Sequence, residues 1–175
     1  MATAGTVVRV AACPAAFGRA PAAGEVFAWR IDLANPPVPA DELFARLTAA
    51  ERARATRYLS PASRTQFTIG RGLLRGLLAP ADVPLSYLPS GKPVCPDPRC
   101  GLHFNVTHTD GVAVLAVARR PVGVDVEVVR PVRDMGGLVR RYFSPAEAEA
   151  FAALPEADQP AGFFRGWTTK EAVIK

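Results

Sequence analysis

One short segment occurs twice in the sequence, and this repeat restricts the folds open to the chain. "RYLSPA" at residues 57–62 returns as "RYFSPA" at residues 141–146. In each copy, a serine followed by proline is typical of a helix start, with serine as the N-cap and proline in the first turn. The repeat favours two lobes of like topology, related by a pseudo-twofold axis. The alternatives are a chance match, or two segments that are alike only because each begins a helix.

The composition indicates a globular protein with a substantial core. The 175 residues suit one domain or a compact pair of lobes, and 49% of them are hydrophobic. No apolar run has the length of a membrane span, and Arg9 interrupts the only candidate for a secretory signal. We therefore expect a cytoplasmic protein with no membrane partner.

Basic residues exceed acidic ones. The net charge is +5, and only three of the 21 basic residues are lysines: Lys92, Lys170 and Lys175. Arginine-rich composition is one explanation, and an anionic partner, either a phosphate or an acidic protein surface, is the functional one. The three cysteines are expected to be free thiols. A zinc site is disfavoured because the cysteine spacing fits a zinc finger poorly, although four residues suggest it: Cys95, Cys100, His103 and His108.

The hydrophobic pattern predicts a mixed α+β chain. Strands are expected at residues 7–11, 25–33, 85–88, 111–118 and 123–129, the last two adjacent and joined through residues 119–121. Helices are expected at residues 40–47, 49–58, 60–79 and 143–154, and from residue 158 to the end. Small residues in the third helix would permit close packing, and residues 104–109 are expected to form a loop before the next strand.

Two acids alternate with valines in "GVDVEVV" at residues 123–129. On a strand, Asp125 and Glu127 face the same side, and their charges repel unless a cation lies between them. A solvated strand face is one explanation, and Mg²⁺, which binds carboxylates together with substrate phosphates, is the other. The terminal "WTTKEAVIK" supplies a third carboxylate, Glu171, with Lys175 on the same helical face.

Four motifs occur in one order: "GKP" (Gly91–Pro93), "FNVTHT" (Phe104–Thr109), "GVDVE" and "WTTKEAVIK". Together they resemble the surfactin-type 4′-phosphopantetheinyl transferases, over about residues 26–175. These enzymes move the 4′-phosphopantetheine arm of coenzyme A onto a serine of an apo acyl or peptidyl carrier protein. Adenosine 3′,5′-bisphosphate is released. The resemblance implies an α+β fold of two pseudo-twofold lobes, with coenzyme A as co-substrate between them.

The resemblance also implies roles for single residues. Mg²⁺, or alternatively Mn²⁺, would be held by Asp125, Glu127 and Glu171. Glu171 would be the base for the carrier serine, and Lys175 would stabilise the departing phosphate. The phosphates of coenzyme A would be bound by Thr107, His108, Lys170 and Lys175, and the adenine pocket would be lined by Lys92 and Pro93. Arg54 matches the contact to the 3′-phosphate, with Arg64 and Arg71 as alternatives.

The expected organisation is a flexible segment at residues 1–24, a first lobe at 25–120 and a second lobe at 121–175. Members of the family continue beyond the lysine matched by Lys175, so the second lobe is expected to be incomplete. A truncated homologue that binds coenzyme A or a carrier without turnover is therefore an alternative. A different Mg²⁺-dependent phosphoryl or phosphodiester enzyme, such as a nuclease, is another alternative. No evenly basic face with interspersed aromatic residues supports a nucleic-acid partner.

Overall fold

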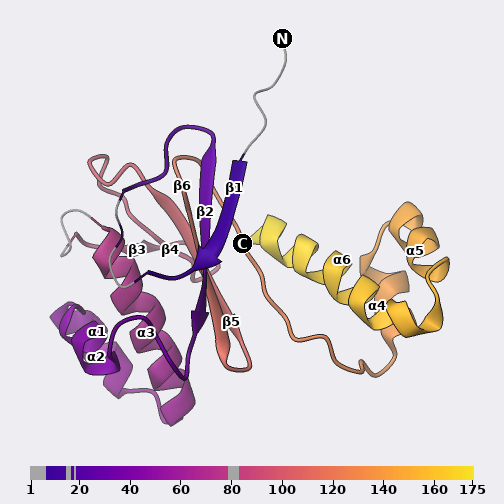
Figure 1. Cartoon of the computed structure of the whole chain (residues 1–175), viewed down its shortest axis with the longest axis horizontal. Coiled ribbons are helices and arrows are strands. Elements are labelled where there is room, and N and C mark those ends of the chain that lie inside the picture. Colours follow the sequence, from indigo (N-terminus) through magenta and orange to yellow (C-terminus); the bar gives the residue numbers. More distant parts are fainter. Residues whose placement is uncertain (1–6, 15–16, 18, 79–82) are drawn as a thin grey trace.

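A four-stranded sheet organises the first two thirds of the chain. The computed structural model describes residues 7–14, 17, 19–78 and 83–175. The strands lie in the order β1-β2-β6-β5, with β1 and β2 parallel and the other pairs antiparallel (Figure 1). Their bounds are β1 (Val7–Ala12), β2 (Glu25–Asp32), β5 (His103–Thr109) and β6 (Val112–Ala118). The predictions at residues 7–11, 25–33 and 111–118 are confirmed.

A hairpin forms one side of this sheet. β5 and β6 are joined through Asp110 and Gly111, and Gly111 has a φ of 73°, which glycine adopts without strain. β6 is apolar throughout because it lies between β2 and β5. The expected loop at Phe104–Thr109 is wrong, since these residues form β5. Their polar side chains are tolerated because β5 is an edge strand and one of its faces contacts other polar groups.

Three helices cover one face of the sheet: α1 (Ala40–Ala45), α2 (Ala49–Thr56) and α3 (Pro61–Leu77) (Figure 1). As predicted, Ser60 caps α3 and Pro61 occupies its first turn. A side chain at Gly72 would meet the Leu43 carbonyl oxygen at 2.6 Å, so glycine lets α1 pack closely on α3. The main core lies between α3 and the sheet, and its fully buried members include Ile31, Leu43, Ile69, Leu73 and Leu115.

A second, smaller sheet follows α3. β3 (Ser86–Tyr87) pairs with β4 (Pro93–Val94) around the "GKP" turn. The prediction of a strand near residues 85–88 is confirmed, whereas β4 was not predicted. The expected end of α3 at Ala79 and the first residues of the following loop lie outside the described residues. No helix in the described ranges has both the length and the hydropathy that a bilayer span requires.

All the regular elements in residues 121–175 are helical. These are α4 (Met135–Tyr142), α5 (Pro145–Ala152), a 3-10 turn (Glu156–Asp158) and α6 (Gln159–Ile174), which share a small core around Val139, Phe163 and Phe164. Figure 1 shows α6 directing its C-terminal end toward the sheet. The capping box predicted for α5 is present, with Ser144 and Glu147 as partners.

The strand predicted at Gly123–Val129 is wrong. Residues 121–130 form neither strand nor helix in the structure. We call residues 121–129 the acidic segment. α4 was missed because two glycines in its first turn hide the helical pattern, although Asp134 caps it from a left-handed conformation. The two repeat copies share a helix start, but α3 has 17 residues and α5 has eight.

Candidate active site

A cavity of about 280 Å³ opens between α3, the "GKP" turn and β5. This volume is near the lower end for small-molecule pockets, which is roughly 300 Å³. Its walls combine basic and aromatic side chains, namely Arg54, Tyr58, Phe67, Arg71, Tyr87 and His108. Cations beside aromatic rings suit a ligand that carries both negative charge and a planar ring.

Arg54 of α2 lies between two of the rings. Its guanidinium carbon is 5.3 Å from the ring centres of both Phe67 and Tyr87. Arg71 of α3 approaches the same rings at 5.5 and 5.8 Å. Contacts of this kind contribute about 0.5–1 kcal/mol each at exposed sites. The two arginines and two rings therefore form one ordered wall of the cavity.

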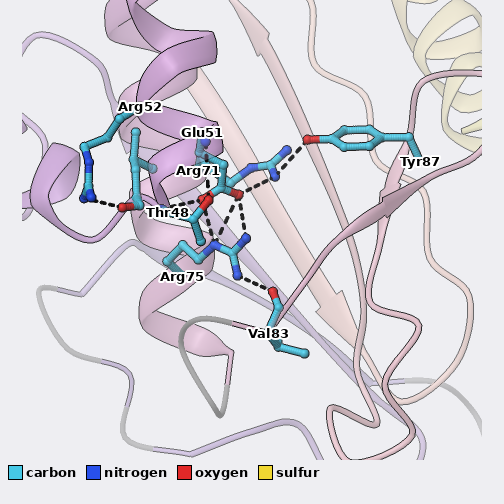
Figure 2. Close-up of polar contacts among 8 residues, drawn as sticks. Thr48, Glu51, Arg52, Arg71, Arg75, Val83 and Tyr87 are labelled. Carbon is cyan, nitrogen blue, oxygen red and sulfur yellow. Dashed lines mark hydrogen bonds and ion pairs between the residues drawn. The ribbon is translucent and has the colours of Figure 1, made fainter.

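A buried ionic network supports this wall (Figure 2). Arg71 Nη1 donates to Glu51 Oε1 at 2.8 Å and to the Tyr87 hydroxyl at 3.2 Å. Arg75 donates to both oxygens of Glu51, with Nη2 to Oε1 at 2.6 Å and Nε to Oε2 at 2.9 Å, and to the Val83 carbonyl at 2.6 Å. One carboxylate therefore faces two guanidinium groups, which leaves a net positive charge beneath the cavity.

Burial alone would raise the pKa of the Glu51 carboxyl. Hydrogen bonds from Arg75, from the Thr48 amide and from Arg71 outweigh this effect and bring the pKa to about 2. Glu51 also forms a capping box with Thr48 at the start of α2. The same side chain thus caps α2 and orients both arginines of α3.

Neighbouring residues of β5 face opposite sides of the sheet, as in any strand. His108 is exposed and lines the cavity, whereas Thr107 is buried and donates to Asp125 Oδ1 at 3.0 Å. The expected phosphate contacts, Thr107 and His108, are therefore adjacent in the chain but point in different directions.

Asp125 is the most buried of the expected acidic residues, with only 5% of its side chain exposed. Its Oδ1 accepts from Thr107 and forms an ion pair with Lys175 at the end of α6. Lys175 Nζ also lies 3.4 Å from Thr107 Oγ1. The other oxygen, Asp125 Oδ2, is buried and has no hydrogen-bond partner among the described residues. A buried carboxylate oxygen of this kind is well placed to bind a cation.

The other two expected metal ligands lie in different surroundings. Glu127 accepts from Thr109 at 3.5 Å and is 3.8 Å from Arg130. The Glu171 side chain is half-buried and makes no hydrogen bond or ion pair within the described ranges. No group of three or more His, Cys, Asp or Glu side chains among the residues described is arranged to hold a metal. The three expected ligands are therefore not gathered into one cluster, and neither are the residues of the zinc alternative. All three cysteines are free thiols.

Several other expected residues lie outside the cavity. Lys92 donates to the Val122 carbonyl at 2.7 Å and borders a neighbouring cavity, while Pro93 lines both. Arg64 is exposed and donates to the backbone carbonyls of Thr56, at the end of α2, and of Tyr58, which follows it.

Lys170 is also engaged elsewhere. It pairs with Glu147 of α5 at 2.7 Å and lies over the Phe143 ring, so it joins α5 to α6.

Sequence reasoning missed the aromatic wall and the Glu51 network. Arg71 and Arg75 are four residues apart, so both lie on one face of α3. This spacing indicates two neighbouring cations that need a shared partner if the face is buried. Nothing local in the sequence identifies their partner, because Glu51 reads simply as a capping residue of another helix. Tyr58, Phe67 and Tyr87 come from separate elements and meet only in the folded chain.

Comparison with known proteins relates the chain to one superfamily of enzymes. Residues 121–175 match the ACPS family model, which describes the 4′-phosphopantetheinyl transferase superfamily. The chain is 40% identical over 160 residues to the 4′-phosphopantetheinyl transferase HetI of Nostoc, covering 86% of this chain and 68% of HetI. It is 29% identical over 141 residues to a 4′-phosphopantetheinyl transferase of Bacillus subtilis, covering 77% and 62%.

A further relative is the 4′-phosphopantetheinyl transferase AcpT of Escherichia coli, at 35% identity over 113 residues, covering 64% of this chain and 57% of AcpT. The chain therefore spans about two thirds of these relatives or less. The match to HetI extends well beyond the residues that the family model covers, because it includes 86% of the chain. On this evidence, the chain belongs to the 4′-phosphopantetheinyl transferase superfamily.

Proposed function

We propose that this chain transfers the 4′-phosphopantetheine arm of coenzyme A to a serine of an apo acyl or peptidyl carrier protein, in the manner of the surfactin-type enzymes. One observation carries the proposal. The buried Asp125, with an unpartnered oxygen and Lys175 beside it, lies next to the strand that also presents His108 to a cationic, aromatic cavity. Two consecutive residues of β5, Thr107 and His108, thus connect the acidic site at Asp125 with the cavity that suits an aromatic anion.

Mg²⁺, with Mn²⁺ as the alternative, fits the chemistry of the Asp125 oxygen that has no partner. Glu127 and Glu171 complete the proposed ligand set. When bound, the ion would neutralise charge on the pyrophosphate of coenzyme A. The present partner of Asp125 is the Lys175 ammonium, which supplies positive charge at the same carboxylate.

The chain's own residues then divide the remaining work. Arg54 and Arg71 would bind the 3′-phosphate and ribose end in the cavity, and His108 would contact the phosphates from β5. Glu171 is the proposed acceptor of the proton from the carrier serine hydroxyl. The serine oxygen forms a bond to the β-phosphorus, and the bond to the bridging oxygen breaks. Lys175 would stabilise the departing adenosine 3′,5′-bisphosphate.

We also propose two lobes, residues 25–120 and 121–175, that meet where α6 approaches β5. The separate cores of the two parts support this division. The net charge of +5 would favour encounter with an acidic carrier protein.

Formation of adenosine 3′,5′-bisphosphate tests the proposed reaction. The chain is incubated with coenzyme A, Mg²⁺ and a panel of apo carriers, and the product is separated by chromatography. Asp125→Asn should lower the rate by at least about a hundredfold. Asp110→Asn is the matched control, because the same chemical change is made at a carboxylate that is 81% exposed. Equal rates for both variants would contradict the role given to Asp125.

A second candidate is binding without turnover. It is favoured by the observation that the three carboxylates do not form a cluster among the described residues. In that case coenzyme A should bind, measured by calorimetry, while no bisphosphate appears with any carrier.

A further inference from the structure

The acidic segment lies beside β5 without a strand ladder. Side chains of β5 make the contacts instead, at alternate positions. The Val124 amide donates to Asn105 Oδ1 at 2.9 Å, Thr107 contacts Asp125, and Thr109 contacts Glu127. The residue numbers of the contacting positions rise together in β5 and in the acidic segment, so the segment runs in the same direction as β5. The position of Asp125 therefore depends on side chains rather than on sheet pairing.

Lys92 holds the segment at Val122, two residues before the contact of Val124 with Asn105. Its ammonium donates to the Val122 carbonyl at 2.7 Å. Burial lowers the pKa of Lys92, as expected for an ammonium removed from water. Lys92 borders the cavity that includes Pro121 and His103, and it is absent from the lining of the cavity that contains Arg54. The lysine of the "GKP" turn is thus directed at backbone of the acidic segment.

Asn105 provides the second contact and is only 6% exposed. Between the two held groups lies Gly123, where a side chain would meet the Ala172 carbonyl oxygen at 1.8 Å. The backbone here touches the last turn of α6, which carries Lys175. The "GKP" turn, β5 and α6 therefore meet at three consecutive residues, 122–124, immediately before Asp125.

We propose that Lys92 and Asn105 are positioning residues that hold Val122 and Val124, and thereby place Asp125 against Lys175. Lys92 then acts on the acidic segment and not on coenzyme A, which changes the role implied by the resemblance. The structural part of this inference concerns the free chain. Its consequence for catalysis rests on the proposed function.

Hydrogen exchange of the free chain tests the structural part, with neither metal nor coenzyme A present. Lys92→Met and Asn105→Leu each remove one contact, and Lys92→Arg and Asn105→Asp retain a donor and an acceptor. We expect the first pair to increase exchange at residues 121–129 by about threefold to tenfold, as loss of one hydrogen bond predicts. The second pair should stay near the wild-type rate. Peptides from α3 are the internal reference, and Arg19→Met, which removes a distant exposed ion pair with Glu25, is the control.

Binding of adenosine 3′,5′-bisphosphate without metal separates the two roles of Lys92. A positioning role predicts an affinity within twofold of wild type for Lys92→Met. A tenfold loss of affinity, or unchanged exchange in both Lys92→Met and Asn105→Leu, would overturn the proposal. If Asn105→Leu does not fold, the two Lys92 variants alone decide it.

The kinetics of transfer measure the effect of Lys92 on catalysis. We expect kcat to fall about tenfold in Lys92→Met while the KM for coenzyme A stays within twofold, with Lys92→Arg restoring kcat. An increase in KM with unchanged kcat would instead identify Lys92 as a ligand contact and overturn the proposal. A wild-type chain that does not transfer at all would refute the proposed function, and the exchange result would still decide the structural part.

Discussion

Replacing Glu51 by glutamine should strongly destabilise the protein, although the change removes little more than one charge. The carboxylate receives hydrogen bonds at 2.6–2.9 Å from two arginines. Arg71 and Arg75 are only 8% and 2% exposed, so loss of the carboxylate charge leaves two largely desolvated guanidinium groups without a counter-charge. Glutamine can preserve the capping box with the Thr48 amide, and the variant therefore isolates the charge. Breaking a buried ion pair on one side costs about 3–5 kcal/mol.

Urea denaturation followed by circular dichroism at pH 7 measures this loss in the free energy of unfolding. Glu42→Gln is a matched control, because Glu42 is an exposed acid in the first turn of α1. We expect Glu42→Gln to change the free energy of unfolding by less than about 0.5 kcal/mol. A loss below about 1 kcal/mol for Glu51→Gln would refute the reasoning, since the two guanidinium groups would then not need the carboxylate.

The loss in the free energy of unfolding caused by Glu51→Gln should also depend on pH. The pKa of Glu51 is about 2 in the folded protein and about 4.3 in an unfolded chain. A lowered pKa contributes stability that is complete above the unfolded value and is lost as the pH falls through the folded value. The difference between wild type and Glu51→Gln should therefore shrink between about pH 5 and pH 2. A difference that stays constant over this range would contradict the assigned pKa.

Three further predictions concern the candidate site. Gly123→Ala places a methyl group 1.8 Å from the Ala172 carbonyl oxygen, so transfer should fall at least about tenfold, and wild-type activity would refute the close approach. Lys170→Met removes the pair with Glu147 and should leave coenzyme A affinity within twofold by calorimetry; a tenfold loss would restore the phosphate contact that the resemblance implied. Tyr87→Phe removes the hydrogen bond from Arg71 and should weaken adenosine 3′,5′-bisphosphate binding by about threefold to tenfold, whereas unchanged affinity would show that this bond does not order the cavity wall.

Local patterns predicted most of the helices and strands. The N-cap serine and first-turn proline of α3 and the capping box of α5 are signals that operate over a few residues, and both gave correct helix starts. The continuous apolar run of β6 was equally clear, because most of this central strand is buried on both faces. Where the glycines of α4 weakened the local signal, the helix was missed.

The acidic segment shows why local patterns are insufficient. Its alternation of valines and acids is that of a strand, but strand formation requires a neighbour that offers backbone groups. Here the Val122 carbonyl and the Val124 amide are taken by Lys92 and Asn105. The fold brings Asp125 and Lys175, two residues that the resemblance singled out, into contact from distant parts of the chain. The roles of Asp125, Glu127, Glu171 and Lys175 stay predictions.

The mass of the carrier protein is the most direct test of the central claim, because it records the transferred group itself. The folded chain is incubated with coenzyme A, Mg²⁺ and a panel of fatty-acid, polyketide and nonribosomal-peptide apo carriers, and each carrier is weighed intact. We predict that at least one carrier gains the mass of a single phosphopantetheine, and that the gain disappears with a chelator and in Asp125→Asn. A folded chain that leaves every carrier at its apo mass would contradict the proposed transferase activity.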